Sequence, residues 1–113
     1  MKCKKLDVWK KALNLSIDVY KVFKDCKDFS FKDQITKSSL SIVSNIAEGS
    51  ERFSDLEKIR FFEYAIGSLA EFQTQCIIGK EINYLTLEHY NKWISESDEI
   101  HKMLIGLIKK LKK

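Results

Sequence analysis

The chain has 113 residues, of which 44% are hydrophobic and 32% are charged, and its formal net charge is +4 at pH 7. This length suits a single domain, residues 1–113, with enough apolar residues for a hydrophobic core. No apolar run approaches the ~18 residues of a bilayer-spanning helix. Charged residues also interrupt the N-terminal segment, so it does not resemble a secretory signal. We therefore expect a cytoplasmic protein.

The chain contains no proline and only four glycines, which predicts long helices with short connections. Apolar residues recur at helical spacing over residues 6–25, where we predict the first helix. They form two adjacent stripes, which is wider than one helix needs to face one core. Two interpretations stay open: the helix is wedged between two neighbours, or one stripe is a self-association interface. The stripes are Trp9, Leu13, Ser16, Tyr20 and Phe23, and Ala12, Leu15, Val19 and Val22.

The second helix is predicted over residues 31–48, after a short polar link. Ser30 and Asp33 have the spacing of a capping box, in which side chains bond the free backbone N–H groups at a helix start. Gly49 follows the last apolar position of this helix. We expect it to take the left-handed conformation that closes many helices. A tight turn at residues 50–53 then leads into the third helix.

The third helix is predicted to be the longest, over residues 54–83, and Ser54 and Glu57 repeat the capping-box spacing at its start. Gly67 lies in its middle, where glycine costs about 1 kcal/mol relative to alanine. Close packing against the second helix, which is rich in serine, would explain this cost. A second stripe on the third helix is a further candidate interface, formed by Phe61, Ala65, Ser68, Phe72 and Gly79.

A turn at residues 83–86 separates the third helix from the fourth. Thr86 is the expected N-cap of the fourth helix, because its hydroxyl can accept a hydrogen bond from a free backbone N–H. This helix is predicted to run to Leu111. Four helices with short connections predict an all-α, antiparallel, up-down-up-down four-helix bundle.

Residue types that carry catalysis or bind metals show no supporting pattern. The three cysteines have no short spacing, which argues against a zinc site or a disulfide framework, and Cys76 falls on an apolar stripe. His89 and His101 share no metal-ligand spacing with a cysteine or carboxylate. Glu48 and Glu71 are expected at different levels of the bundle, so they do not suggest an acid–base pair. We expect no enzyme activity, no metal and no cofactor.

Motifs spread over nearly the whole chain have the order and spacing of a known family. They are Asp7–Ala12, Val19-Tyr20, Ser41-Ile42, Asn45–Gly49, Arg52, Ser54, Glu57, Phe61, Ala65–Ser68 and Glu71. The chain resembles the four-helix-bundle proteins encoded within intervening sequences of bacterial 23S ribosomal RNA genes. This family includes the accessory variability determinant of diversity-generating retroelements. The chain departs from it at Thr36 and Lys37, where two arginines are common, and in a first loop without proline or glycine.

The resemblance implies a homopentamer, with five bundles in a ring-like barrel, and no enzyme activity. Retroelement members are implicated in binding nucleic acid and a reverse transcriptase. For members encoded in intervening sequences, no defined role follows from membership. The implied partners are therefore further copies of the chain, RNA or DNA, or a second protein such as a polymerase or reverse transcriptase.

The antiparallel topology would bring both termini and the turn between the second and third helices to one end. Residues 1–12, 47–63 and 102–113 hold thirteen basic and six acidic residues, so the difference is +7. The rest of the chain holds seven basic and ten acidic residues, a difference of −3. Such a basic end would attract phosphates by releasing their counterions. The candidate nucleic-acid-binding residues are Lys4, Lys5, Lys10, Lys11, Arg52, Lys109, Lys110, Lys112 and Lys113.

Two functions are consistent with these features. The first is a non-enzymatic, homo-oligomeric protein that binds nucleic acid through the basic end. No RNA-binding signature is present, so we expect this binding to be non-specific. The alternative is a structural assembly module that binds another protein and makes no direct contact with nucleic acid. In that case the terminal lysines would be solvated tails that keep the protein in solution.

Overall fold

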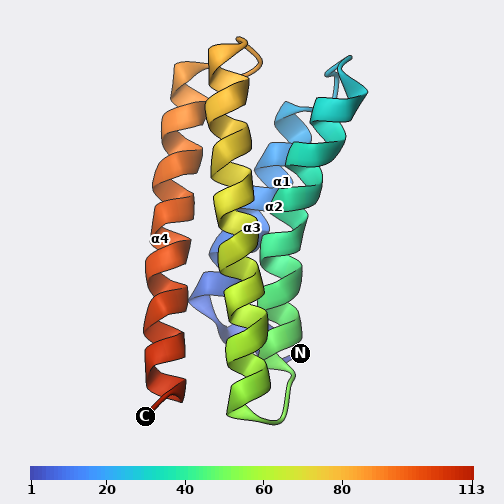
Figure 1. Ribbon diagram of the computed structural model, residues 1–113. Coiled ribbons are helices and arrows are strands. Elements are labelled where there is room, and N and C mark those ends of the chain that lie inside the picture. The colour runs from blue at the N-terminus through green and yellow to red at the C-terminus, as the bar shows by residue number, and fades with distance from the viewer.

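Four helices form nearly the whole molecule in the computed structural model, which describes residues 1–113 (Figure 1). A short 3-10 helix, η1 (Lys2–Lys5), precedes α1 (Asp7–Val22), α2 (Phe29–Ser50), α3 (Asp55–Glu81) and α4 (Leu87–Leu111). Successive helices run in opposite directions and no strand is present, so the predicted all-α, up-down-up-down bundle is confirmed. None of these helices combines the length and the apolar character needed to cross a membrane.

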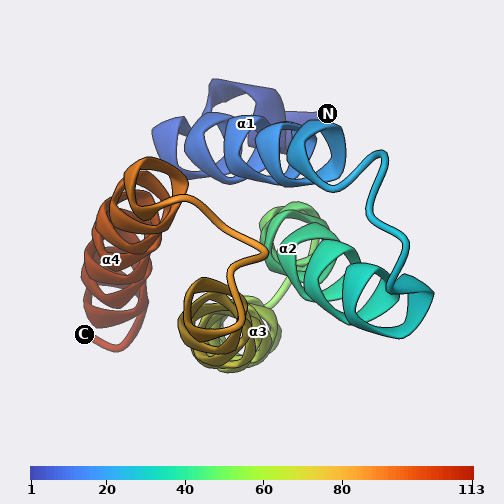
Figure 2. The same cartoon turned by 90° about the horizontal axis from the view of Figure 1, so that it is seen from above.

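Helix α1 packs alongside both α2 and α4, and α3 lies diagonally opposite it across the core (Figure 2). Helix α1 is therefore wedged between two neighbours; Tyr20 on its first stripe remains exposed, and self-association through that stripe stays a prediction. The bundle also covers the second stripe of α3, where Ala65, Phe72 and Gly79 are buried and Phe61 is half-buried. Phe61 and Ser68 remain partly exposed, so a single bundle buries most of this candidate interface but not all of it.

The core runs through the bundle and includes an aromatic cluster around Trp93. The Trp93 ring centroid lies 6.1 Å from that of Phe23 and 6.0 Å from that of Phe72. Trp93 is fully buried, and its indole Nε1 donates a hydrogen bond to Asp18 Oδ2 at 2.7 Å. An indole N–H buried without a partner would cost free energy, so Asp18 allows the largest side chain to fill the core.

The predicted start of α3 is confirmed, because Ser54 Oγ accepts a hydrogen bond from the Glu57 N–H at 3.1 Å. Thr86 Oγ1 likewise accepts from the His89 N–H at 3.1 Å and caps α4 as predicted. In both cases the partners are three residues apart. Local spacing was therefore sufficient to identify the cap.

The predicted capping box at Ser30 is wrong, because α2 begins at Phe29 and its N-cap is Asp28. Asp28 Oδ1 accepts a hydrogen bond from the Phe31 N–H at 3.1 Å, and Asp28 Oδ2 accepts one from the Tyr84 hydroxyl at 2.8 Å. The Phe31 amide and then the Tyr84 hydroxyl lower the pKa of the Asp28 carboxyl. The second partner comes from the α3–α4 turn, so local spacing at Ser30 gave no sign of it.

Gly49 does not end α2, which continues to Ser50, and no glycine in the chain has a positive φ. The predicted left-handed cap is therefore wrong. Gly49 is buried at a close approach between helices, where an added Cβ would lie 2.8 Å from Phe62 Cε1 and 3.1 Å from Phe61 Cβ. By contrast, an added Cβ at Gly67 would meet nothing within 4 Å. The predicted close packing occurs at Gly49 and not at Gly67.

The serine-rich face of α2 does pack against α3, through hydrogen bonds between side chains. Ser38 Oγ donates to Gln75 Oε1 at 2.6 Å, and the Ser41 and Ser68 hydroxyl oxygens lie 2.8 Å apart. Small polar side chains let the two helices approach closely while their hydroxyl groups remain paired.

Candidate nucleic-acid interface

The basic end of the bundle comprises residues 1–12, 47–63 and 102–113. It contains η1, the α2–α3 turn and the last turns of α4, which the antiparallel topology brings together (Figure 1). The Lys2 backbone N–H donates a hydrogen bond to Glu51 Oε2 at 3.0 Å and so joins η1 to the α2–α3 turn. Cys3 is fully buried and holds η1 against the helices. The backbone segment that carries the N-terminal lysines is therefore held in place.

Most of the candidate binding residues are exposed on this end. Seven of them are exposed and form no ion pair, so their ammonium groups face solvent: Lys4, Lys5, Lys10, Lys109, Lys110, Lys112 and Lys113. They lie in η1, in the first turn of α1, and in or after the last turn of α4. Lysines at a helix C-terminus also interact favourably with the helix dipole, which gives those of α4 a structural role as well.

The other two candidates, Lys11 and Arg52, are paired within the chain. Lys11 Nζ lies 2.8 Å from Glu99 Oε1, and this hydrogen bond raises the pKa of Lys11. Arg52 Nη2 lies 2.9 Å from Glu48 Oε2, and its guanidinium carbon lies 4.6 Å from the centroid of the Phe61 ring. The Arg52 Nε is buried without a hydrogen-bond partner. Both side chains link structural elements, so their charges are less available to a ligand than those of the seven exposed lysines.

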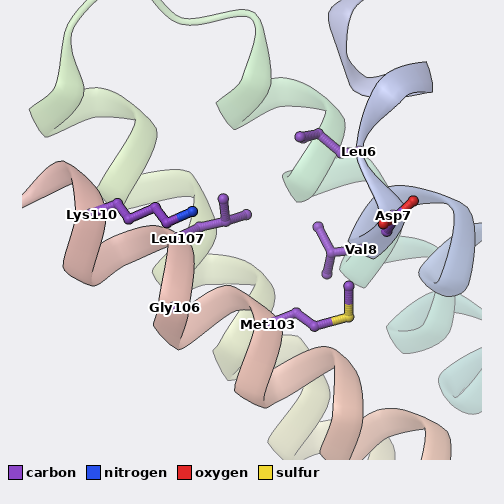
Figure 3. A pocket seen from close by; sticks show the side chains of 7 residues that line it. All are labelled: Leu6, Asp7, Val8, Met103, Gly106, Leu107 and Lys110. Atoms are coloured by element: carbon purple, nitrogen blue, oxygen red, sulfur yellow. The ribbon is translucent and has the colours of Figure 1, made fainter.

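Two adjoining depressions open at the basic end. The first, which we call the end groove, has a volume of about 310 Å³. Figure 3 shows Met103 and Leu107 extending from α4 toward Val8 and Leu6 at the start of α1. The second, which we call the end hollow, has a volume of about 320 Å³. It is lined by Lys2, Leu6, Ser50, Lys58, Phe62, Leu107, Lys110 and Leu111.

The end hollow combines an apolar floor with three lysines that come from three different elements. Lys2 belongs to η1, Lys58 to α3 and Lys110 to α4. Lys58 Nζ donates to the Ser50 carbonyl at 3.3 Å, which leaves the other two protons of its ammonium group for other acceptors. This arrangement suits a group with an apolar or aromatic body and an anionic substituent. Lys2 and Lys58 were counted in the charge of this end but were not predicted as binding residues, because only the fold brings them together.

Phe53 is a further residue that the sequence analysis did not identify. It lies in the α2–α3 turn and is 98% exposed. It precedes the N-cap Ser54, a position where an apolar residue often packs against the fourth residue of the helix. That fourth residue is Lys58, which offers no apolar partner. This mismatch between Phe53 and Lys58 was the available signal that Phe53 would remain exposed.

Comparisons with known proteins place this fold in a sequence family. Residues 4–106 match the family model described as 23S rRNA-intervening sequence protein. A similar solved structure is that of a protein of unknown function from the S23 ribosomal protein family of Bacteroides thetaiotaomicron. It shares 29% sequence identity, the alignment covers 90% of this chain and 98% of that one, and the TM-score is 0.84. No curated protein matches the sequence significantly.

Proposed function

The chain belongs to the family of 23S rRNA-intervening sequence proteins, and we propose that it is a homo-oligomeric protein that binds nucleic acid through its basic end. The seven exposed lysines without ion pairs carry this proposal. Lysines that neutralise phosphates release condensed counterions, which favours binding whatever the base sequence. The proposed binding is therefore non-specific, and the protein catalyses no reaction.

The proposed assembly is a homopentamer. Large apolar side chains that the bundle leaves exposed along α3 support self-association, because a second copy of the chain could bury them. They are Leu56, Tyr64, Ile77 and Ile78, together with Ile82 just after the end of the helix. The open space around Gly67 would allow a second chain to approach this helix closely. In a ring of parallel bundles every basic end lies on the same rim, so one nucleic acid contacts several chains.

The proposal is tested by neutralising lysines at the basic end and measuring binding across a salt series. The test variant changes four exposed lysines to Gln: Lys4, Lys5, Lys10 and Lys109. The control variant removes the same charge nearer the opposite end: Lys21, Lys24, Lys27 and Lys37. Lys32 is left in place because its Nζ donates to the Lys24 carbonyl at 3.0 Å. Fluorescence anisotropy with labelled RNA and DNA gives the affinity at each salt concentration.

We expect the test variant to bind more weakly and to show a flatter salt dependence than the control variant. Each phosphate that is no longer neutralised should reduce the log–log slope by about 0.9 on duplex DNA. Equal weakening in both variants would show that only net charge matters and that the basic end is not a site. If the unmodified protein binds neither RNA nor DNA at low salt, the proposal of nucleic-acid binding is wrong, and the alternative of a scaffold that binds another protein replaces it.

A further inference from the structure

We infer that the basic end takes an unpaired strand of nucleic acid rather than a duplex, with bases stacked on Phe53 and seated in the end hollow. This inference rests on the proposed function and specifies its ligand. Two features carry it: the exposed aromatic ring of Phe53 and the apolar floor of the end hollow. A surface that contacted phosphates alone would need neither feature.

Phe53 provides a flat, exposed apolar face in the α2–α3 turn. Lys58 and the exposed Arg60 follow in the first two turns of α3, and the acidic Glu51, Asp55 and Glu57 also lie close to the ring in sequence. Aromatic rings in a basic groove are the usual platforms for unpaired bases, and every base has a face that can stack on them. In a duplex both faces of each internal base are covered by neighbouring base pairs. Phe53 can therefore stack on internal bases of an unpaired strand but not on those of a duplex.

The end hollow lies at the same end of the bundle as this ring. Ser50 and Lys58 both line it, and the turn that contains Phe53 connects these two residues. Its volume of about 320 Å³ is roughly ten times the ≈ 30 Å³ share of one water molecule in the liquid. An unpaired base can cover the apolar floor while adjacent phosphates reach Lys2 and Lys110. A duplex presents its phosphates outward and would leave this floor uncovered.

Electrostatics alone predict the opposite preference. Duplex DNA has the higher charge density, and its salt slope per neutralised phosphate is about 0.9, against about 0.7 for single strands. A basic end that contacted only phosphates would therefore bind duplex at least as tightly as a single strand. Tighter binding of the single strand would require contacts with bases, for which Phe53 and the end hollow are the candidates.

The test compares an unstructured single strand, oligo(dT), with a duplex that carries the same number of phosphates. The full-length protein should bind oligo(dT) more tightly in anisotropy measurements. Phe53→Ala should weaken oligo(dT) binding by about 5- to 150-fold, the range expected for one stacked base, and leave duplex binding unchanged. Phe53→Trp should retain the affinity, and its fluorescence should fall when oligo(dT) stacks on the ring.

Two further variants separate this site from general effects. Phe29→Ala is the matched control, because Phe29 is also strongly exposed but lies at the start of α2, at the opposite end of the bundle. It should not alter binding. Lys58→Gln keeps a donor for the Ser50 carbonyl but removes one charge from the end hollow. It should weaken oligo(dT) binding and reduce the salt slope by about 0.7.

The outcomes distinguish this inference from the proposed function. Absence of binding to either nucleic acid at low salt would overturn both. Duplex binding as tight as oligo(dT) binding would overturn the inference alone. The inference alone would also be overturned if Phe53→Ala left the affinity for oligo(dT) unchanged, or if it weakened binding to oligo(dT) and to the duplex equally. Light scattering supplies the last check, because a changed molar mass in Phe53→Ala would assign Phe53 to contact with a second copy and overturn the inference.

Discussion

Two glycines that look alike in the sequence provide a direct test of the helix packing. Gly49 and Gly67 both lie within helices, and we consider Gly49→Ala and Gly67→Ala as a pair. The added methyl group at Gly49 would lie 2.8 Å from Phe62 Cε1, whereas at Gly67 it would meet nothing within 4 Å. Phe62 is only 4% exposed, so its ring is packed among neighbours and must shift for the methyl group to fit.

These distances predict that the same substitution changes the free energy of unfolding in opposite directions at the two positions. Alanine removes the propensity cost of glycine, which is up to about 1 kcal/mol in the interior of a helix. Gly67→Ala should therefore raise the free energy of unfolding by about that amount. At Gly49 the gain is smaller because the helix ends at the next residue, and overpacking typically costs about 1–3 kcal/mol. We expect Gly49→Ala to be destabilised by up to about 2 kcal/mol.

Urea denaturation followed by circular dichroism measures both variants. The protein concentration must be the same throughout, because the stability of an oligomer depends on it. Equal stability of Gly49→Ala and Gly67→Ala would refute the argument that α2 and α3 approach closely at Gly49. If Gly67→Ala instead loses stability and dissociates, then Gly67 lies against a second copy of the chain.

Two further predictions concern ionisable groups. Cys26 should be the only cysteine that reacts with a thiol reagent in the native protein. Burial raises the pKa of Cys76 to about 12, and Cys3 is fully buried. Rapid labelling of two or three thiols before unfolding would contradict this. Asp28→Asn should be less stable than the unmodified protein at neutral pH, since hydrogen bonds from the Phe31 amide and the Tyr84 hydroxyl lower the pKa of the folded carboxyl. The difference in stability between the unmodified protein and Asp28→Asn should shrink as the pH falls below about 4, because the carboxyl is then protonated. If urea denaturation gives the same difference in acid as at neutral pH, the Asp28 carboxylate does not stabilise the fold.

The position of the basic end followed from the sequence, but the availability of its charges did not. Short connections between helices require the antiparallel topology. This topology brings the two termini of the chain, where lysines are frequent, to one end of the bundle. Lys11 is paired because Glu99 faces it from α4, and Glu99 lies outside the segments from which the charge was counted. Lys2 and Lys58 line one hollow although 56 positions separate their numbers, a proximity that no local pattern encodes.

The sequence by itself determined the four helices, the caps at Ser54 and Thr86, and the end at which positive charge gathers. These features depend on residues within one or two helical turns and on the length of the connections. Only the tertiary structure decided that Tyr84 bonds to the Asp28 cap, that Gly49 marks a close contact between helices rather than a helix end, and that Lys2 and Lys58 line one hollow. Each of these depends on atoms that a distant segment supplies: the Tyr84 hydroxyl, the Phe62 ring, and the lysine side chains of η1 and α3.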